Sequence, residues 1–135
     1  MIKKVESRIA DVLKHYGLGD AEANIVATLS THGKTNAKEI SKETGYAYST
    51  VVNALNFLNR TGFIEKDRSN RICVYSANID FIKIIENDRR RLSNLLNDLR
   101  EEIKKVEGKY KYKLSNLISR VEATLKYLKK IEEAV

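Results

Sequence analysis

The sequence contains no proline, no tryptophan and a single cysteine among its 135 residues. One cysteine can form neither an intrachain disulfide nor a cysteine-based zinc site, so Cys73 indicates either a reducing compartment or a small buried apolar side chain. The two histidines, His15 and His32, lie far apart and have no thiol at ligand spacing. The sequence therefore predicts no metal site and no bound cofactor.

Long apolar runs are also absent. No stretch approaches the roughly 18–20 consecutive apolar residues of a bilayer span, and the amphipathic start lacks the apolar run of a signal peptide. We therefore expect a soluble, cytoplasmic protein without a membrane partner. The sequence shows no glycine-rich phosphate loop, no nucleophile with an orienting base and no carboxylate pair in a predictable cleft, so an enzyme is not expected.

Basic residues outnumber acidic ones, with 25 Lys and Arg against 18 Asp and Glu and a net charge of +7. Residues 1–80 carry 11 basic and 9 acidic side chains, whereas residues 81–135 carry 14 and 9. This balance favours polyanionic partners such as nucleic acid, although charge says nothing about the fold.

The first 45 residues predict three helices, each followed by a glycine. Apolar residues at three- and four-residue steps predict the first helix over residues 2–16. A second helix is expected from Asp20, whose side chain is predicted to cap it. Asn36 and Glu39 have the spacing of a capping box, which predicts a short third helix that closes at Gly45.

A fourth helix with two different faces is predicted before Gly62. Its apolar stripe consists of Val51, Leu55 and Leu58. Its opposite stripe is polar and consists of Ser49, Asn53, Asn56 and Arg60. The period then changes, because residues 63–66 and 71–75 are rich in β-branched and aromatic side chains around a turn predicted at 67–70. This pattern predicts a β-hairpin with a basic tip, in which Asn70 only shapes the turn.

From Ile79 onward no strand signal remains, and apolar residues alternate three and four apart in two coiled-coil seams. The first seam is Leu92, Leu96, Leu99, Ile103, Val106 and Tyr110, and the second is Leu114, Leu117, Val121, Thr124, Leu128, Ile131 and Val135. The register shifts near Gly108, which follows two lysines suited to a helix end. Two helices of about 27 residues are favoured over one continuous rod.

This order of elements predicts a mainly α protein with a small β-hairpin wing. A winged helix-turn-helix is expected over residues 1–78, followed by long C-terminal coiled-coil helices over residues 79–135. The short third helix would brace the backbone while the fourth presents its polar stripe to a DNA major groove roughly 12 Å wide.

Residues 17–66 resemble the N-terminal domain of archaeal TrmB-like regulators, within the wider MarR and ArsR group. The resemblance rests on ordered features: Gly17-Leu18 before Glu22-Ala23, then Lys38-Glu39-Ile40, Gly45, Ser49-Thr50-Val51, Leu55, Leu58, Gly62 and Tyr75-Ser76-Ala77. It implies a transcriptional regulator that binds specific double-stranded DNA as a homodimer. Two positions depart from the family, which often has arginine at Tyr48 and an acidic residue at Asn59. Larger members carry a C-terminal sugar-binding domain that the helices after Ile79 replace, so the effector stays unknown.

The predicted DNA contacts lie on the third helix, the fourth helix and the wing. Asparagines suit adenine edges, hydroxyls suit phosphates or bases, and wing cations suit phosphates. The full set is Thr35, Asn36, Lys38, Tyr48, Ser49, Thr50, Asn53, Asn56, Arg60, Lys66, Arg68 and Arg71. The alternating basic and aromatic tract at 109–113 is expected to be a solvated helix start or loop, or else to touch DNA or an acidic partner.

The C-terminal seams carry more apolar surface than a free monomer would expose, so a homodimer through these helices is expected. The predicted interface is Leu92, Leu96, Leu99, Ile103, Val106, Leu114, Leu117, Val121, Leu125 and Leu128, buried against the partner or within an antiparallel hairpin. A bundle folded back on the winged domain is the structural alternative. The functional alternatives are an architectural DNA-binding protein with little sequence preference and a winged-helix module that binds proteins.

Overall fold

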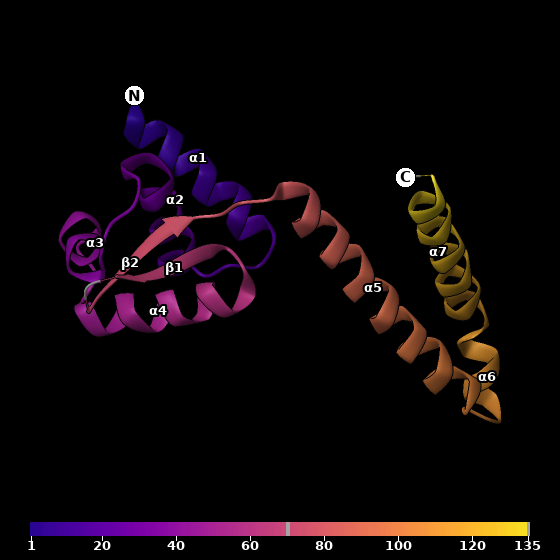
Figure 1. Cartoon of the computed structure of the whole chain (residues 1–135). Helices are drawn as coiled ribbons and strands as arrows, with labels where there is room; N and C mark the ends of the chain where they lie inside the picture. The colour runs from indigo at the N-terminus through magenta and orange to yellow at the C-terminus, as the bar shows by residue number, and fades with distance from the viewer. Residues whose placement is uncertain (70, 135) are drawn as a thin grey trace. The chain divides into compact units, whose positions relative to one another are not determined.

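The computed structural model describes residues 1–69 and 71–134, so the predictions for Asn70 and Val135 lie outside the described residues. The chain divides into two compact units, Met1–Phe81 and Ile82–Val135. The first contains α1 (Ile2–His15), α2 (Asp20–His32), α3 (Ala37–Thr44), α4 (Tyr48–Thr61), β1 (Ile64–Ser69) and β2 (Ile72–Ala77). The helices that follow are α5 (Phe81–Lys104), α6 (Lys109–Lys113) and α7 (Ser115–Glu133). Figure 1 traces this order.

The core of the first unit lies between its helices and the hairpin. Leu13, Ile25, Ile40, Leu55 and Leu58 are completely buried there. Each such side chain stabilises the fold by about 1.5–3 kcal/mol relative to an exposed position. Because α4 packs against α2, α3 and β1, its orientation is set on several sides at once.

The helix ends test the predicted caps. The Asn36 Oδ1 accepts a hydrogen bond from the Glu39 N–H at 2.9 Å, which confirms Asn36 as the cap of α3. The predicted Asp20 cap is wrong, because Gly19 holds the capping position and Asp20 is already helical. The Asp20 carboxylate instead lies 3.2 Å from the Lys14 Nζ, at the end of the preceding helix.

The apolar face predicted for the first helix is only partly covered. In α1, Ala10 and Leu13 are buried, whereas Ile2, Val5 and Val12 are exposed. Helical periodicity placed these apolar residues on one face, but that face is wider than the surface of α2 against which α1 packs.

The hairpin is longer than predicted. Strands β1 and β2 pair antiparallel with Ser69 opposite Ile72, so residues 67–69 belong to a strand and the predicted four-residue turn is wrong. Arg71, directly before β2, has a positive φ of 68°, a backbone conformation common in tight hairpin turns. The extra strand pairs bring Arg68 opposite Cys73 and lengthen the wing.

The second unit is a helical hairpin with a break where the register shifts. Helix α5 ends before Gly108, whose φ of 72° and ψ of −147° suit only a residue without a Cβ. This confirms two helical arms rather than one rod. The second arm is not one long helix, because Leu114 at φ −92° and ψ 0° separates α6 from α7. Among the described residues of the second unit, Ile103 of α5 and Val121 and Leu128 of α7 are buried.

Candidate nucleic-acid interface

The turn between α3 and α4 is held by local hydrogen bonds. Gly45 adopts the left-handed conformation at φ 80°, which a residue without a Cβ reaches without strain. The Ser41 hydroxyl donates to the Tyr46 carbonyl at 2.6 Å, and the Asn24 amide donates to the Tyr46 hydroxyl at 2.9 Å. These bonds fix the angle at which α4 leaves α3.

Helix α4 has one buried apolar side and one exposed polar side. Val51, Leu55 and Leu58 have no exposed surface and anchor the helix in the core. The opposite side is exposed and carries the four side chains predicted for DNA contact: Ser49, Asn53, Asn56 and Arg60. Amide groups can donate and accept at once, which is the pattern of an adenine edge in the major groove.

The start of α4 offers further polar groups. Tyr48 is 59% exposed, and Ser49 and Thr50 beside it are also exposed. Ala47 at the capping position has no side-chain oxygen, so no side-chain hydrogen bond caps this end. The first N–H groups of a helix carry partial positive charge and suit an anionic ligand such as a phosphate.

The three predicted DNA contacts around the start of α3 differ in their exposure and in the hydrogen bonds that they already make. Lys38 is exposed. Thr35 is half-buried, and its backbone exchanges hydrogen bonds with Tyr75 at 3.0 and 2.7 Å. The Asn36 Oδ1 already accepts the capping hydrogen bond, so the NH2 group is the part of this side chain without a capping role. Thr35 therefore has a structural role in the backbone pairing with Tyr75, and Asn36 has one as the cap of α3.

The wing exposes its three predicted cations. Lys66 and Arg68 lie two residues apart on β1, which places them on one face of the hairpin. Arg71 is exposed at the turn. These positions suit contact with a phosphate backbone, because guanidinium and ammonium groups are strong phosphate donors.

An ion pair that the sequence did not predict joins the wing to the α2–α3 connection. The Lys34 Nζ lies 2.8 Å from the Asp67 Oδ2. The hydrogen bond and the positive charge of Lys34 lower the pKa of Asp67 below its ordinary value of 3.8. Thirty-three residues separate the partners, so only tertiary structure could show the pair.

Tyr75 links the wing to the core. It is 7% exposed, and burial together with nearby Cys73 and Tyr48 raises the pKa of its hydroxyl. The backbone pairing between Tyr75 and Thr35 adds the α2–α3 connection to the hairpin edge. The wing therefore contacts the α2–α3 connection at two points, at Tyr75 and at Asp67.

The predicted dimer residues separate into three groups in the second unit. Ile103, Val121 and Leu128 are buried within the hairpin, and Leu96, Val106, Leu114 and Leu125 are half-buried. Leu92, Leu99 and Leu117 are exposed. Ile85 and Leu95, which the predicted interface did not include, are also exposed on α5.

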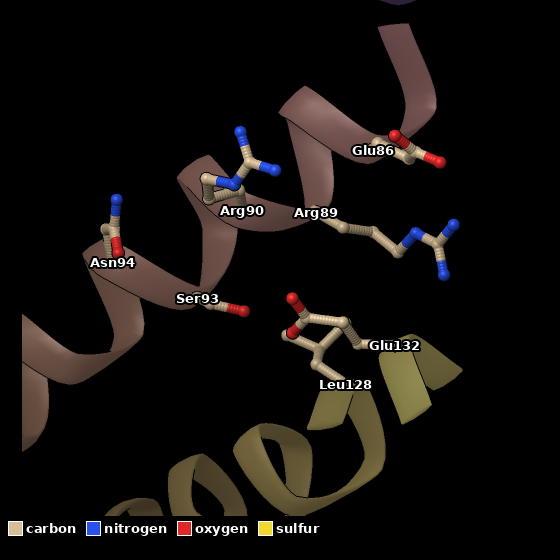
Figure 2. A pocket seen from close by; sticks show the side chains of 7 residues that line it. All are labelled: Glu86, Arg89, Arg90, Ser93, Asn94, Leu128 and Glu132. Carbon is tan, nitrogen blue, oxygen red and sulfur yellow. The ribbon is translucent and has the colours of Figure 1, made fainter. Parts of the chain in front are cut away.

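A cavity of about 460 Å³ lies between the first half of α5 and the end of α7. Figure 2 shows the seven side chains that line it: Glu86, Arg89, Arg90, Ser93, Asn94, Leu128 and Glu132. Six of them are polar or charged, and Leu128 is the only apolar one. The two arms therefore do not close over a continuous apolar seam at this end of the hairpin.

Neither a metal-binding cluster nor a membrane-spanning helix is found within the described residues. No group of three or more histidine, cysteine, aspartate or glutamate side chains there is arranged to hold a metal ion. None of the helices in residues 1–69 and 71–134 combines the length and apolar character that crossing a bilayer requires.

A family model described as "Sugar-specific transcriptional regulator TrmB" matches residues 13–80, which is 68 of the 135 residues. No curated protein matches the sequence. A crystal structure described as that of a transcriptional regulator aligns with a TM-score of 0.63 and 9% identity, over 96% of this chain and 94% of that one. Transcriptional regulator Tm0710 from Thermotoga maritima aligns with a TM-score of 0.50 and 22% identity, over 97% and 87%.

These two structures share the fold of the chain, and the family match covers half of its length. The match spans the turn at Gly45, the polar face of α4 and the wing. The chain therefore belongs to the TrmB family of DNA-binding, winged-helix transcriptional regulators.

Proposed function

We propose that this chain is a homodimeric regulator that binds specific double-stranded DNA sequences. Residues 1–78 are the DNA-binding part and residues 79–135 the dimerisation part. The observation that carries the proposal is the exposed polar face of α4, backed by three completely buried side chains. A rigid helix with amide groups on its free side matches the dimensions and the hydrogen-bonding pattern of a major groove.

In this proposal, Asn53 and Asn56 read base edges, and Tyr48, Ser49 and Thr50 contact bases or phosphates at the start of α4. Arg60 reaches the backbone from the other end of the helix. Lys66, Arg68 and Arg71 hold phosphates beside the groove, and Lys38 with Thr35 and Asn36 does so at the start of α3. Support comes from the exposure of Lys38, of these α4 residues and of the wing cations. Phosphate contacts set orientation, whereas the asparagines supply sequence preference.

The homodimer is assigned to the exposed apolar stripe of α5, on the same side of the helix as the buried Ile103. Ile85, Leu92 and Leu99 recur every seven residues, Leu95 lies between the last two, and all four are at least 39% exposed. A seven-residue apolar repeat is the pattern of a helix that pairs with another helix. A second copy is the natural occupant, because a dimer places two recognition helices about 34 Å apart along one side of a duplex.

The effector is left unassigned. The family match ends at residue 80, and the second unit begins at Ile82. The second unit therefore lies outside the family match, and the match assigns no effector to it.

The test is selection of duplexes from a random pool by the purified full chain at near-physiological salt, followed by sequencing of the retained DNA. We expect enrichment of an inverted repeat with half-sites about one helical turn apart. Retention without enrichment would contradict sequence specificity and indicate an architectural DNA-binding protein. Absence of retention would contradict DNA binding and indicate a winged helix that binds proteins.

A further inference from the structure

The end of the helical hairpin is strongly basic. We call residues 104–113, which comprise the end of α5, the loop and α6, the hairpin tip. The tip contains five lysines and one acidic residue, Glu107. Residues 108–121 contain four basic residues and no acidic one. Such a local excess attracts polyanions whatever the charge elsewhere on the chain.

The lysines of the tip differ in their partners. Lys104 and Lys105 lie 3.8 and 3.2 Å from the carboxylates of Glu101 and Glu102, one turn earlier in α5. Lys109, Lys111 and Lys113 are exposed, and none has a carboxylate within 4.0 Å in the described part of the chain. Three uncompensated ammonium groups therefore lie within five residues.

Two of these lysines are held in place by an aromatic ring. The Nζ atoms of Lys109 and Lys113 lie 5.5 and 5.7 Å from the centroid of the Tyr110 ring. Such cation–π contacts restrict the lysine side chains before any ligand binds, which lowers the entropy lost on binding. Tyr112 is 85% exposed, so its ring and hydroxyl are free to contact a ligand.

We infer that the hairpin tip is a second phosphate-binding surface, which contacts the phosphodiester backbone of duplex DNA through Lys109, Lys111 and Lys113. The contact needs no base recognition, since point charges and a tyrosine hydroxyl bind backbone without reading sequence. The inference rests on the proposed function only in taking DNA as the polyanion. The backbone belongs either to DNA that flanks the winged-helix site or to a second duplex.

Duplex DNA is favoured over an anionic lipid surface. The winged-helix unit already holds DNA in this proposal, which raises the concentration of phosphates near the tip of the same molecule. The ring of Tyr110 lies beside two ammonium groups, whereas that of Tyr112 is exposed, so the rings do not separate the two ligands. The vesicle sample below tests the lipid surface directly.

The experiment compares the full wild-type chain with a tip variant, Lys109→Gln/Lys111→Gln/Lys113→Gln. The matched control is Lys126→Gln/Lys129→Gln/Lys130→Gln, which removes the same charge from three exposed positions on α7. In one arm, affinity is measured against salt on a duplex that contains only the selected site and on a longer duplex with flanks. In the other arm, an immobilised duplex saturated with protein captures a second, fluorescent duplex. Vesicles with anionic lipids form a third sample.

We expect the tip variant, but not the control variant, to lose the DNA contact made by the hairpin tip. If the phosphates flank the site, its salt slope on the long duplex becomes flatter by up to about three, one phosphate for each lysine. If they belong to a second duplex, capture falls while binding to the first duplex is retained. Equal behaviour of the tip variant and wild type in both arms would overturn the inference, as would an equal loss in the control.

Two further outcomes separate this inference from the regulator proposal. If the random pool yields no enriched sequence but only the tip variant loses duplex binding, the regulator proposal fails and the tip stands. Loss of vesicle binding by the tip variant, with no loss of DNA binding, would overturn the inference in favour of a lipid surface.

Discussion

At the residue scale, the clearest assignments are those in which one side of an element is buried and the other is exposed. Asn53 and Asn56 protrude from a helix whose other side has no exposed surface. Their exposure has no packing explanation. By contrast, Asn36 is half-buried and caps α3, so its position has a structural explanation that does not involve DNA.

Asn53→Ala should cost about 1–3 kcal/mol of binding free energy on the selected DNA site and little on random DNA, because in the proposed function this amide reads a base edge. Fluorescence anisotropy on the two duplexes measures the difference. Asn59→Ala is the matched control, since Asn59 is an exposed asparagine outside the polar stripe of α4. An equal loss on both duplexes would show that Asn53 is not a base reader.

Arg68→Ala should weaken binding on every sequence and make the salt slope flatter by about one, because in the proposed function Arg68 contacts a phosphate. The slope is obtained from titrations at several salt concentrations. Arg8→Ala removes an exposed arginine from α1 and should leave the slope unchanged. An unchanged slope in Arg68→Ala would remove this wing residue from the DNA contacts.

The Lys34–Asp67 pair predicts a specific pH dependence. The pKa of Asp67 is lowered in the folded chain, so the contribution of the pair is present above pH 3.8 and is lost as the pH falls through the lowered value. Lys34→Gln should therefore return the pKa of Asp67 toward 3.8, as measured by NMR titration of its carboxyl carbon. Lys38→Gln should not move it. A pKa that is unaffected by Lys34→Gln would contradict the pair.

At the element scale, local signals predicted the helices well and the hairpin less well. Apolar periodicity and following glycines located α1–α4, because the buried stripe of each helix repeats along its own sequence. The hairpin turn was misplaced because Asp67, Arg68 and Ser69 have weak strand preference by themselves. Their pairing with β2 and the ion pair to Lys34 are tertiary effects.

Leu55→Ala should destabilise the first unit by about 2–5 kcal/mol, because a completely buried leucine is replaced by a cavity. Urea unfolding followed by circular dichroism measures the loss. Phe57→Ala removes a larger side chain that is 39% exposed on the same helix, and it should cost less. A greater loss for Phe57→Ala would contradict the orientation of α4 in the core.

At the scale of the whole molecule, the two units differ in how their apolar residues are used. The first unit encloses its own core, whereas the second buries only a few side chains and leaves an apolar repeat on α5 exposed. Exposed repeats of this kind are unfavourable in water unless a partner covers them. The second unit is therefore where self-association is expected.

If the proposed homodimer forms through α5, Leu99→Glu should convert it to a monomer and reduce affinity for an inverted repeat, because burying a charge between paired helices is costly. Light scattering coupled to size exclusion gives the mass. Asn87→Glu introduces the same side chain at an exposed position on the opposite side of α5 and should leave the dimer intact. A dimer that survives Leu99→Glu would place the interface elsewhere.

The sequence by itself determined the order of the helices, the capped turn before α4, the presence of a wing and the break near Gly108. These features depend on residues within a few positions of one another, so their physical causes can be read locally. The same holds for the polar stripe of α4, because the helical period places Asn53 and Asn56 on one face.

Only the tertiary structure decided which apolar residues are covered and which remain free. The seams of the second unit looked equivalent in sequence, yet Ile103, Val121 and Leu128 are buried while Leu92, Leu99 and Leu117 stay exposed. The Lys34–Asp67 pair and the lysines around Tyr110 likewise depend on where side chains meet in space. Burial and charge pairing are properties of neighbours in three dimensions, which a one-dimensional period does not specify.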